Sequence, residues 1–138
     1  MTPVHIVIRT TYRSEGAKES AVCEYEGRRF EKDKAAVLRY EEVFCEGADP
    51  VMTTMYVADN EVRIHRKGSI GGDMVFCEAT PCEFFYRTGF GNLPMEIHTH
   101  RLLVEKKTEG ITVRIVYTLF SGDDAVSETE MEITVTQA

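Results

Sequence analysis

Apolar and polar residues alternate along most of this chain with a period of two. The alternation is clearest in the segments 4–12, 61–68, 111–120 and 127–135. A period of two with one polar face is typical of antiparallel strands that are buried on one side only. The pattern therefore predicts a protein built mainly of β-strands.

Turn-forming segments rich in Gly, Asp, Asn, Pro and Ser separate these runs, which gives about eight to ten strands with short links. KDKAAVLRYEEVF is the one candidate for a helix. No capping residue precedes it, so we read it as a turn followed by a strand near 35–44. Many short antiparallel strands indicate a sandwich or a barrel, and closure removes exposed edges. We predict an all-β fold, a single antiparallel barrel over residues 1–138.

Composition and charge narrow the classes of function. With 138 residues, of which 43% are hydrophobic and 28% charged, the chain has the size and balance of one globular domain. The formal charge of −7 and the lack of a stripe of Lys and Arg argue against nucleic acid and anionic membranes as partners. The start, MTPVHIVIRTTYR, lacks the features of a signal peptide, and no apolar run approaches a membrane span. We expect a cytoplasmic protein with reduced cysteines.

Several short motifs carry a resemblance to a known family. In chain order they are RYEEV (39–43), VRIHRKG (62–68), MVF (74–76), FYRTGFG (85–91), a strand with Thr99, and RIVYTL (114–119). In this order the chain resembles the YwiB-like family of small uncharacterised bacterial proteins, over roughly residues 20–135. The resemblance implies a calycin- or lipocalin-like barrel, and it implies no particular activity.

Arg66 is the first candidate for a functional residue. It shares a strand face with Val62 and Ile64, so we expect its side chain inside the barrel near one mouth. A buried guanidinium must be paired, or it costs several kcal/mol. Its partner is either a carboxylate of the protein, Glu41 or Glu42, or the acidic head of a bound ligand.

Hydroxyl groups could complete a binding site around Arg66. Tyr86, Thr88 and Tyr117 are candidates for inward-pointing hydroxyls. A barrel of this size is filled by its own side chains or holds one small ligand, and the sequence does not decide between them. One hypothesis is a module that binds a small amphipathic or acidic ligand. The alternative is a packed structural barrel that forms a homo-oligomer, such as a homodimer.

A third hypothesis is a metal-dependent enzyme. His98 and His100 share a strand face and could bind one metal ion together with His5, His65 or Glu96.

The opposite face of this strand carries Met95, Ile97 and Leu103 and resembles the core, so we expect both histidines at the surface. No motif for a catalytic nucleophile or a phosphate-binding loop is present. We therefore favour a non-enzymatic protein without a cofactor.

Each cysteine is followed by a glutamate, at Cys23, Cys45, Cys77 and Cys82. Alternation then places each cysteine inward and each glutamate outward, which is typical of free cysteines in a core.

Overall fold

Antiparallel strands make up the fold, and the prediction of an all-β barrel is confirmed. The computed structural model describes residues 1–43, 47, 49–68 and 71–138, and in these ranges it has ten strands and no helix. No helix that could cross a membrane is found in this part of the chain. The strands are β1 Thr2–Ser14, β2 Ala17–Lys32, β3 Ala35–Glu42, β4 Val51–Val57, β5 Val62–Lys67, β6 Met74–Phe76, β7 Cys82–Thr88, β8 Gly91–Lys106, β9 Gly110–Ser121 and β10 Asp124–Gln137.

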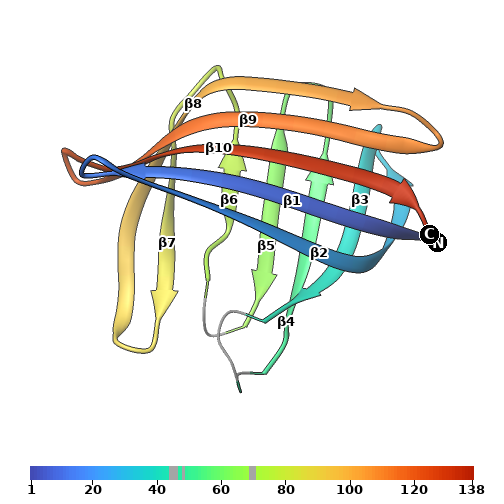
Figure 1. The fold of residues 1–138 in the computed structure, drawn as a ribbon, viewed down its shortest axis with the longest axis horizontal. Coiled ribbons are helices and arrows are strands. Elements are labelled where there is room, and N and C mark those ends of the chain that lie inside the picture. The colour runs from blue at the N-terminus through green and yellow to red at the C-terminus, as the bar shows by residue number, and fades with distance from the viewer. Residues whose placement is uncertain (44–46, 48, 69–70) are drawn as a thin grey trace.

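All ten strands belong to one sheet that is wound into a nearly closed barrel (Figure 1). Their order in space is β6-β5-β4-β3-β2-β1-β10-β9-β8-β7, so every neighbour is adjacent in sequence except the pair β1 and β10. That pair brings the two termini side by side (Figure 1). The remaining seam lies between β6 and β7. Gly71 and Arg87 bridge this seam with two backbone hydrogen bonds of 3.0 and 2.7 Å.

The segment that could have been a helix forms β3, as predicted. Leu38, Tyr40 and Glu42 are buried on one face of this strand, whereas Arg39 and Glu41 are exposed on the other. Burial at every second position is the pattern of a strand with one buried face. In a helix the buried positions would instead recur every three or four residues.

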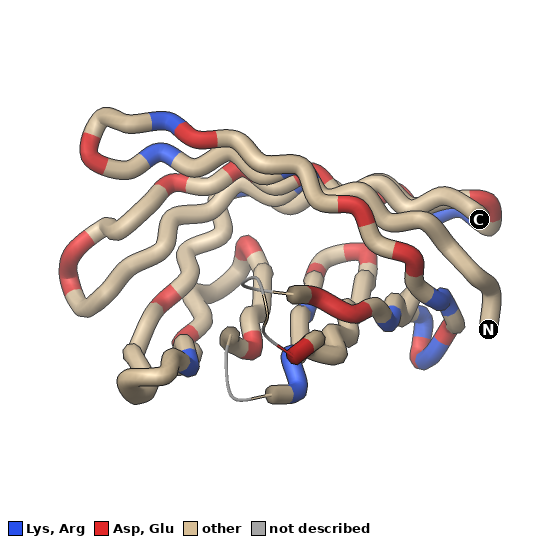
Figure 2. The backbone as a smooth tube through the Cα atoms, turned by 60° about the horizontal axis from the view of Figure 1, so that its bottom comes forward, with Lys and Arg blue, Asp and Glu red and all other residues tan. Residues whose placement is uncertain are grey.

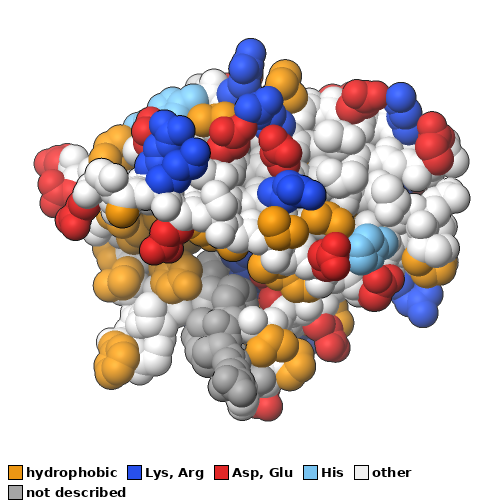
Figure 3. Space-filling view, in the orientation of Figure 1, with side chains coloured by type: hydrophobic (Ala, Val, Ile, Leu, Met, Phe, Trp, Pro, Cys, Tyr) orange, Lys and Arg blue, Asp and Glu red, His pale blue; other side chains and the backbone are white. Residues whose placement is uncertain are grey.

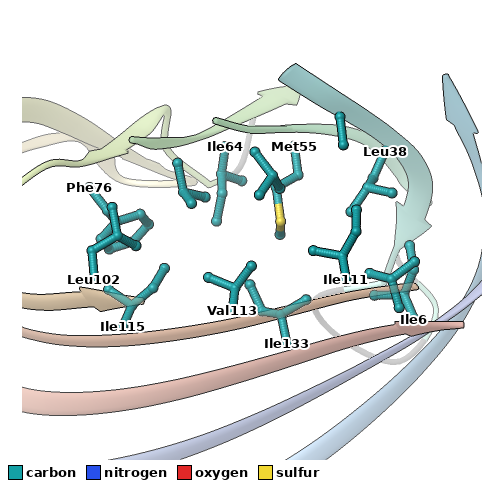
Figure 4. Close-up of a cluster of buried hydrophobic side chains, with 14 of the residues drawn as sticks. Ile6, Leu38, Met55, Ile64, Phe76, Leu102, Ile111, Val113, Ile115 and Ile133 are labelled. Atoms are coloured by element: carbon teal, nitrogen blue, oxygen red, sulfur yellow. The ribbon is translucent and has the colours of Figure 1, made fainter. Parts of the chain in front are cut away.

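One half of the barrel interior is filled by aliphatic side chains (Figure 4). Side chains from opposite walls meet there, and these eleven large ones are less than 2% exposed: Phe76, Ile6, Leu38, Met55, Ile97, Ile111, Ile115, Ile133, Val57, Val62 and Val113. This packed half provides the apolar burial that stabilises the fold.

A bulge in β8 reverses the expected faces of its second half. The register with β9 shifts between Thr99 and Arg101, so that Leu102 is 8% exposed and Leu103 is 52% exposed. The expectation that Leu103 belongs to the core is therefore wrong, because one extra residue moves every later side chain to the other face. The backbone N–H of Leu102 donates to Glu78 Oε1 at 3.1 Å, in the link before β7.

Strand β2 leaves one side of the barrel open. It pairs with β1 from Ala17 to Arg29, but with β3 only from Arg28 to Lys32. In the described chain, residues 17–27 therefore have a strand on one side only. Gly27 marks the point where β2 turns toward β3, and a Cβ atom there would lie 2.6 Å from the carbonyl oxygen of Arg39. Only glycine permits this close approach of two backbones.

Charged residues are distributed along the strands without a basic stripe (Figure 2). Acidic and basic positions are both scattered over the strands and turns of the drawn backbone.

Candidate functional site

A polar cluster lies inside the barrel beside its packed half. Glu42, Thr53 and Arg66 come from three adjacent strands, β3, β4 and β5, and their register places them together, with Thr53 directly opposite Arg66. Arg66 Nε donates to Glu42 Oε1 at 3.0 Å, and Thr53 Oγ1 donates to the same oxygen at 2.6 Å. The side chains of Arg66 and Glu42 are only 14% and 11% exposed. The pair is thus a largely buried ion pair with an additional hydroxyl donor.

Arg66 also connects β5 to the segment that follows it. Its Nη1 donates to the carbonyl oxygen of Gly72 at 3.3 Å, and its backbone N–H donates to Asp73 Oδ1 at 3.1 Å. Arg87 Nη2, from the far side of the seam, donates to the carbonyl oxygen of Arg66 at 2.6 Å. A Cβ atom on Gly72 would lie 2.8 Å from the ring of Phe84, so this segment packs closely against β7. These contacts fix the position of the guanidinium and hold the seam together.

Three tyrosines lie near the ion pair. The rings of Tyr25 and Tyr40 are 4.8 Å apart, and Tyr117 lies on the inner face of β9. Burial raises the pKa of all three phenols, and that of Tyr117 to about 12. The pKa values of Tyr25 and Tyr40 rise further because the carboxylate of Glu42 is nearby. The three hydroxyls are therefore neutral near pH 7.

Next to this cluster, one inner-face side chain each of β1 and β10 and two of β2 are wholly or partly open to solvent. We define this open side by Ile8, Cys23, Tyr25 and Met131. Ile8, Tyr25 and Met131 are half-buried against the core, and Cys23 is exposed. They are open because β2 has separated from β3 at this level, so that no described strand lies beside its edge.

The β7–β8 hairpin forms an arm on the other side of this region. Phe84 is buried and therefore marks the inner face of the hairpin. Tyr86, two residues further along β7, lies on the same face, and so does its cross-strand partner Leu93. They are 38% and 53% exposed. Figure 3 shows hydrophobic side chains gathered on the arm and on the part of the barrel directly above it. The region therefore combines apolar walls with one buried ion pair.

Two of the residues predicted to surround Arg66 do not contact it. Glu42, not Glu41, is the partner of Arg66, because Glu41 lies on the exposed outer face of β3. The hydroxyl of Thr88 is used in the turn of the arm, where it donates to the carbonyl oxygen of Gly91 at 2.7 Å. It is therefore not directed toward Arg66.

Tyr117 and Tyr86 both lie on inner faces, Tyr117 buried and Tyr86 partly open. Thr53 was not among the site residues predicted from the sequence. The alternation in VMTTMYV places it on the same face as Val51 and Met55, so this pattern could have identified it as an inner-face residue.

His98 and His100 have separate partners. His98 Nε2 hydrogen bonds to Glu96 and its ring lies 4.6 Å from that of Phe120, while His100 Nε2 hydrogen bonds to Thr118 Oγ1 at 2.7 Å.

The proposed third ligands are engaged elsewhere: His5 contacts Glu26, and His65 contacts Asp73. Across the described ranges, no group of three His, Cys, Asp or Glu side chains could hold a metal ion. A metal-dependent enzyme therefore gains no support from the structure.

The cysteines differ from the expected pattern. Cys23 has the inner-face register opposite Ile8, yet it is exposed because the barrel is open there. Phe76 occupies the inner face at the end of β6, so its neighbour Cys77 does not. The prediction that these two cysteines are core residues is wrong. Cys82 is half-buried opposite Ile97, and Cys45 lies outside the described residues.

Fold and site together define a small antiparallel β-barrel, packed in one half and partly open in the other, with an ion pair between the two parts. The model of a family described as a domain of unknown function, DUF1934, matches residues 6–133, and the chain belongs to this family. The crystal structure of the YwiB protein from Bacillus subtilis is similar to this chain, with a TM-score of 0.88, 21% identity, and coverage of 99% of this chain and 92% of that chain. The resemblance to the YwiB-like family is thus confirmed, and at this identity it shows the fold alone. No curated protein matches.

Proposed function

We propose that this protein binds a small amphipathic molecule on the open side of its barrel. The observation that carries the proposal is the position of the ion pair of Arg66 and Glu42 beside the half-exposed inner-face residues Ile8, Tyr25 and Met131. An apolar chain would cover these residues, and its polar end would lie against the ion pair. Ligand sites in proteins commonly combine apolar walls with a few fixed polar groups.

Native mass spectrometry of protein purified without chelator tests this proposal. We expect an added mass that organic solvent releases, and we expect the Arg66→Ala variant to retain less of it. Arg63→Ala is the matched control, because Arg63 lies on the outer face of the same strand and bonds to Glu61. A clean protein mass, together with no thermal stabilisation by medium-chain alkyl compounds, would contradict the proposal. A ligand at 100 times its Kd stabilises the folded state by about 2.7 kcal/mol.

A second candidate function is self-association through the open edge of β2. This edge offers unpaired backbone groups over residues 17–27 of the described chain, and such edges bind other strands. A two-fold antiparallel pairing centred on Val22 would place Lys18 opposite Glu26 of a second copy, so that the charges are complementary.

Light scattering over a concentration series tests whether a homodimer forms. We expect Lys18→Glu to weaken the dimer, and we expect the charge exchange in Lys18→Glu/Glu26→Lys to restore it. A monomer at all concentrations, or a dimer that is indifferent to both variants, would reject this edge as the interface.

A further inference from the structure

We infer that a second binding site, for a small organic anion, lies in a cavity at the end of the barrel where the two termini lie. The cavity has a volume of about 630 Å³ and is formed by the start of β1, the last residues of β2 and β10, and the turn from β8 to β9 (Figure 1). It shares no lining residue with the open side, so the inference is independent of the proposed function. Ligand sites commonly have volumes in this range.

Arg29 gives the cavity a fixed positive charge. Its side chain lines the cavity and is only 12% exposed. Nε donates to Glu31 Oε1 at 2.8 Å, and Nη1 donates to the carbonyl oxygens of Lys107 at 2.9 Å and Thr108 at 3.4 Å. These contacts hold the guanidinium in place. Nη2 has no acceptor among the described residues, so its two N–H groups are left for an acceptor outside the protein.

Lys106 brings a second, largely buried cation to the same cavity from β8, which lies four strands from β2 in the sheet. Its side chain is 18% exposed, and Nζ donates to the carbonyl oxygen of Lys34 at 2.7 Å and lies 3.3 Å from Asp59 Oδ1.

The carboxylates paired with these two cations lie in water. Glu31, the partner of Arg29, is 61% exposed, and Asp59, the partner of Lys106, is 91% exposed. Water screens the charge of an exposed group far more strongly than that of a buried one. Inside the cavity the two cations are therefore only partly compensated, and an anion there would lie close to both.

The remaining lining favours an anion with an apolar body. Lys107 adds a third cation and Glu109 a second carboxylate, so cations exceed carboxylates among the lining side chains by three to two. The formal charge of −7 opposes this excess only weakly, because charges more than about 8 Å away are largely screened at physiological ionic strength. Val4 and Phe30 line the same cavity, so an apolar group can pack there.

Titration with phenyl phosphate, benzoate and the neutral compound benzamide tests the site in the intact protein. We expect phenyl phosphate to bind at least about tenfold more tightly than benzamide, because charge-assisted hydrogen bonds are stronger than neutral ones. Amide shifts in NMR spectra should centre on Gly110 and Val135, which line the cavity. Tightest binding of benzoate would equally support an anion site, with a carboxylate as its head.

Three results of this titration would overturn the inference. They are equal binding of benzamide, no binding by any of the three compounds at millimolar concentration, and shifts confined to Ile8 and Tyr25 on the open side. The proposed function stands or falls separately, by the mass measurement on Arg66→Ala.

Two variants should change the affinity for phenyl phosphate in opposite directions. Arg29→Gln removes the fixed cation, and we expect binding at least about tenfold weaker. Glu31→Gln removes a competing negative charge and keeps an acceptor for Arg29 Nε, and we expect binding about threefold tighter. Because Glu31 is exposed, this second variant decides the question even if Arg29→Gln does not fold.

Arg28→Gln and Glu19→Gln are the matched controls. Each changes the net charge as its counterpart does, and both residues are exposed on β2 and do not line the cavity. We expect neither to change the affinity by more than about twofold. If the controls shifted the affinity as much as Arg29→Gln and Glu31→Gln do, the attraction would be general and the cavity would not be the site.

Discussion

Replacement of Glu42 by leucine is expected to lower the free energy of unfolding by about 3 kcal/mol, since removal of one partner of a buried ion pair is strongly destabilising. The guanidinium of Arg66 is only 14% exposed in its side chain, and it would lose its hydrogen bond to Glu42 Oε1. Thr53 Oγ1 would lose its acceptor at the same time. The contact of Arg66 with the carbonyl oxygen of Gly72 remains, so the loss should fall at the lower end of the range for buried ion pairs. Urea unfolding followed by circular dichroism measures the change.

The double variant Glu42→Leu/Arg66→Met separates charge from packing. Because an apolar pair of similar volume often replaces a buried ion pair without loss, we expect this variant to recover at least half of the lost stability. Glu41→Leu is the matched control on the exposed face of β3. If Glu42→Leu were as stable as the parent protein, the ion pair would not be a structural element of the barrel. If only the double variant were unstable, Arg66 would stabilise the fold independently of Glu42.

The strands could be predicted from the sequence because a period of two is a direct consequence of strand geometry. β3 shows this well: its Ala-Ala-Val-Leu run has the composition of a helix, yet Tyr40 and Glu42 continue the face of Leu38. The same alternation could have chosen Glu42 over Glu41 as the partner of Arg66. Alternation in the sequence thus predicts which residues face inward wherever the strand is regular.

The bulge and the open side could not be predicted in this way. No residue type marks where β8 gains its extra residue, so Leu103 was assigned to the wrong face. Cys23 was assigned to the inner face, and the register agrees, but its exposure depends on how far β3 runs beside β2. The polar cluster likewise requires the register of three strands, which alternation within one strand does not contain. These features depend on pairings between residues that are distant in the chain.

Truncation of Phe76 to alanine is expected to cost about 3–5 kcal/mol, since it removes a buried ring and leaves a cavity. Phe76 is fully buried, and its ring centroid lies 4.8 Å from that of Tyr117 on the opposite wall. β6 is only three residues long and has ladder pairing with β5 alone. Phe76 is therefore its main anchor to the rest of the core. At about 2–4 °C per kcal/mol for a domain of this size, the thermal midpoint should fall by roughly 6–20 °C.

Phe90→Ala removes the same ring from the tip of the β7–β8 arm and isolates the contribution of burial. Phe90 is fully exposed, so its truncation should change the stability by less than about 0.5 kcal/mol. Equal losses in the two variants would contradict the assignment of Phe76 to the core. A large loss of unfolding free energy in Phe76→Ala, with an unchanged slope of that free energy against urea concentration, would show that β6 and the seam unfold together with the whole barrel. A decreased dependence would instead indicate that β6 and the seam detach first, because less surface would then be exposed in the main transition.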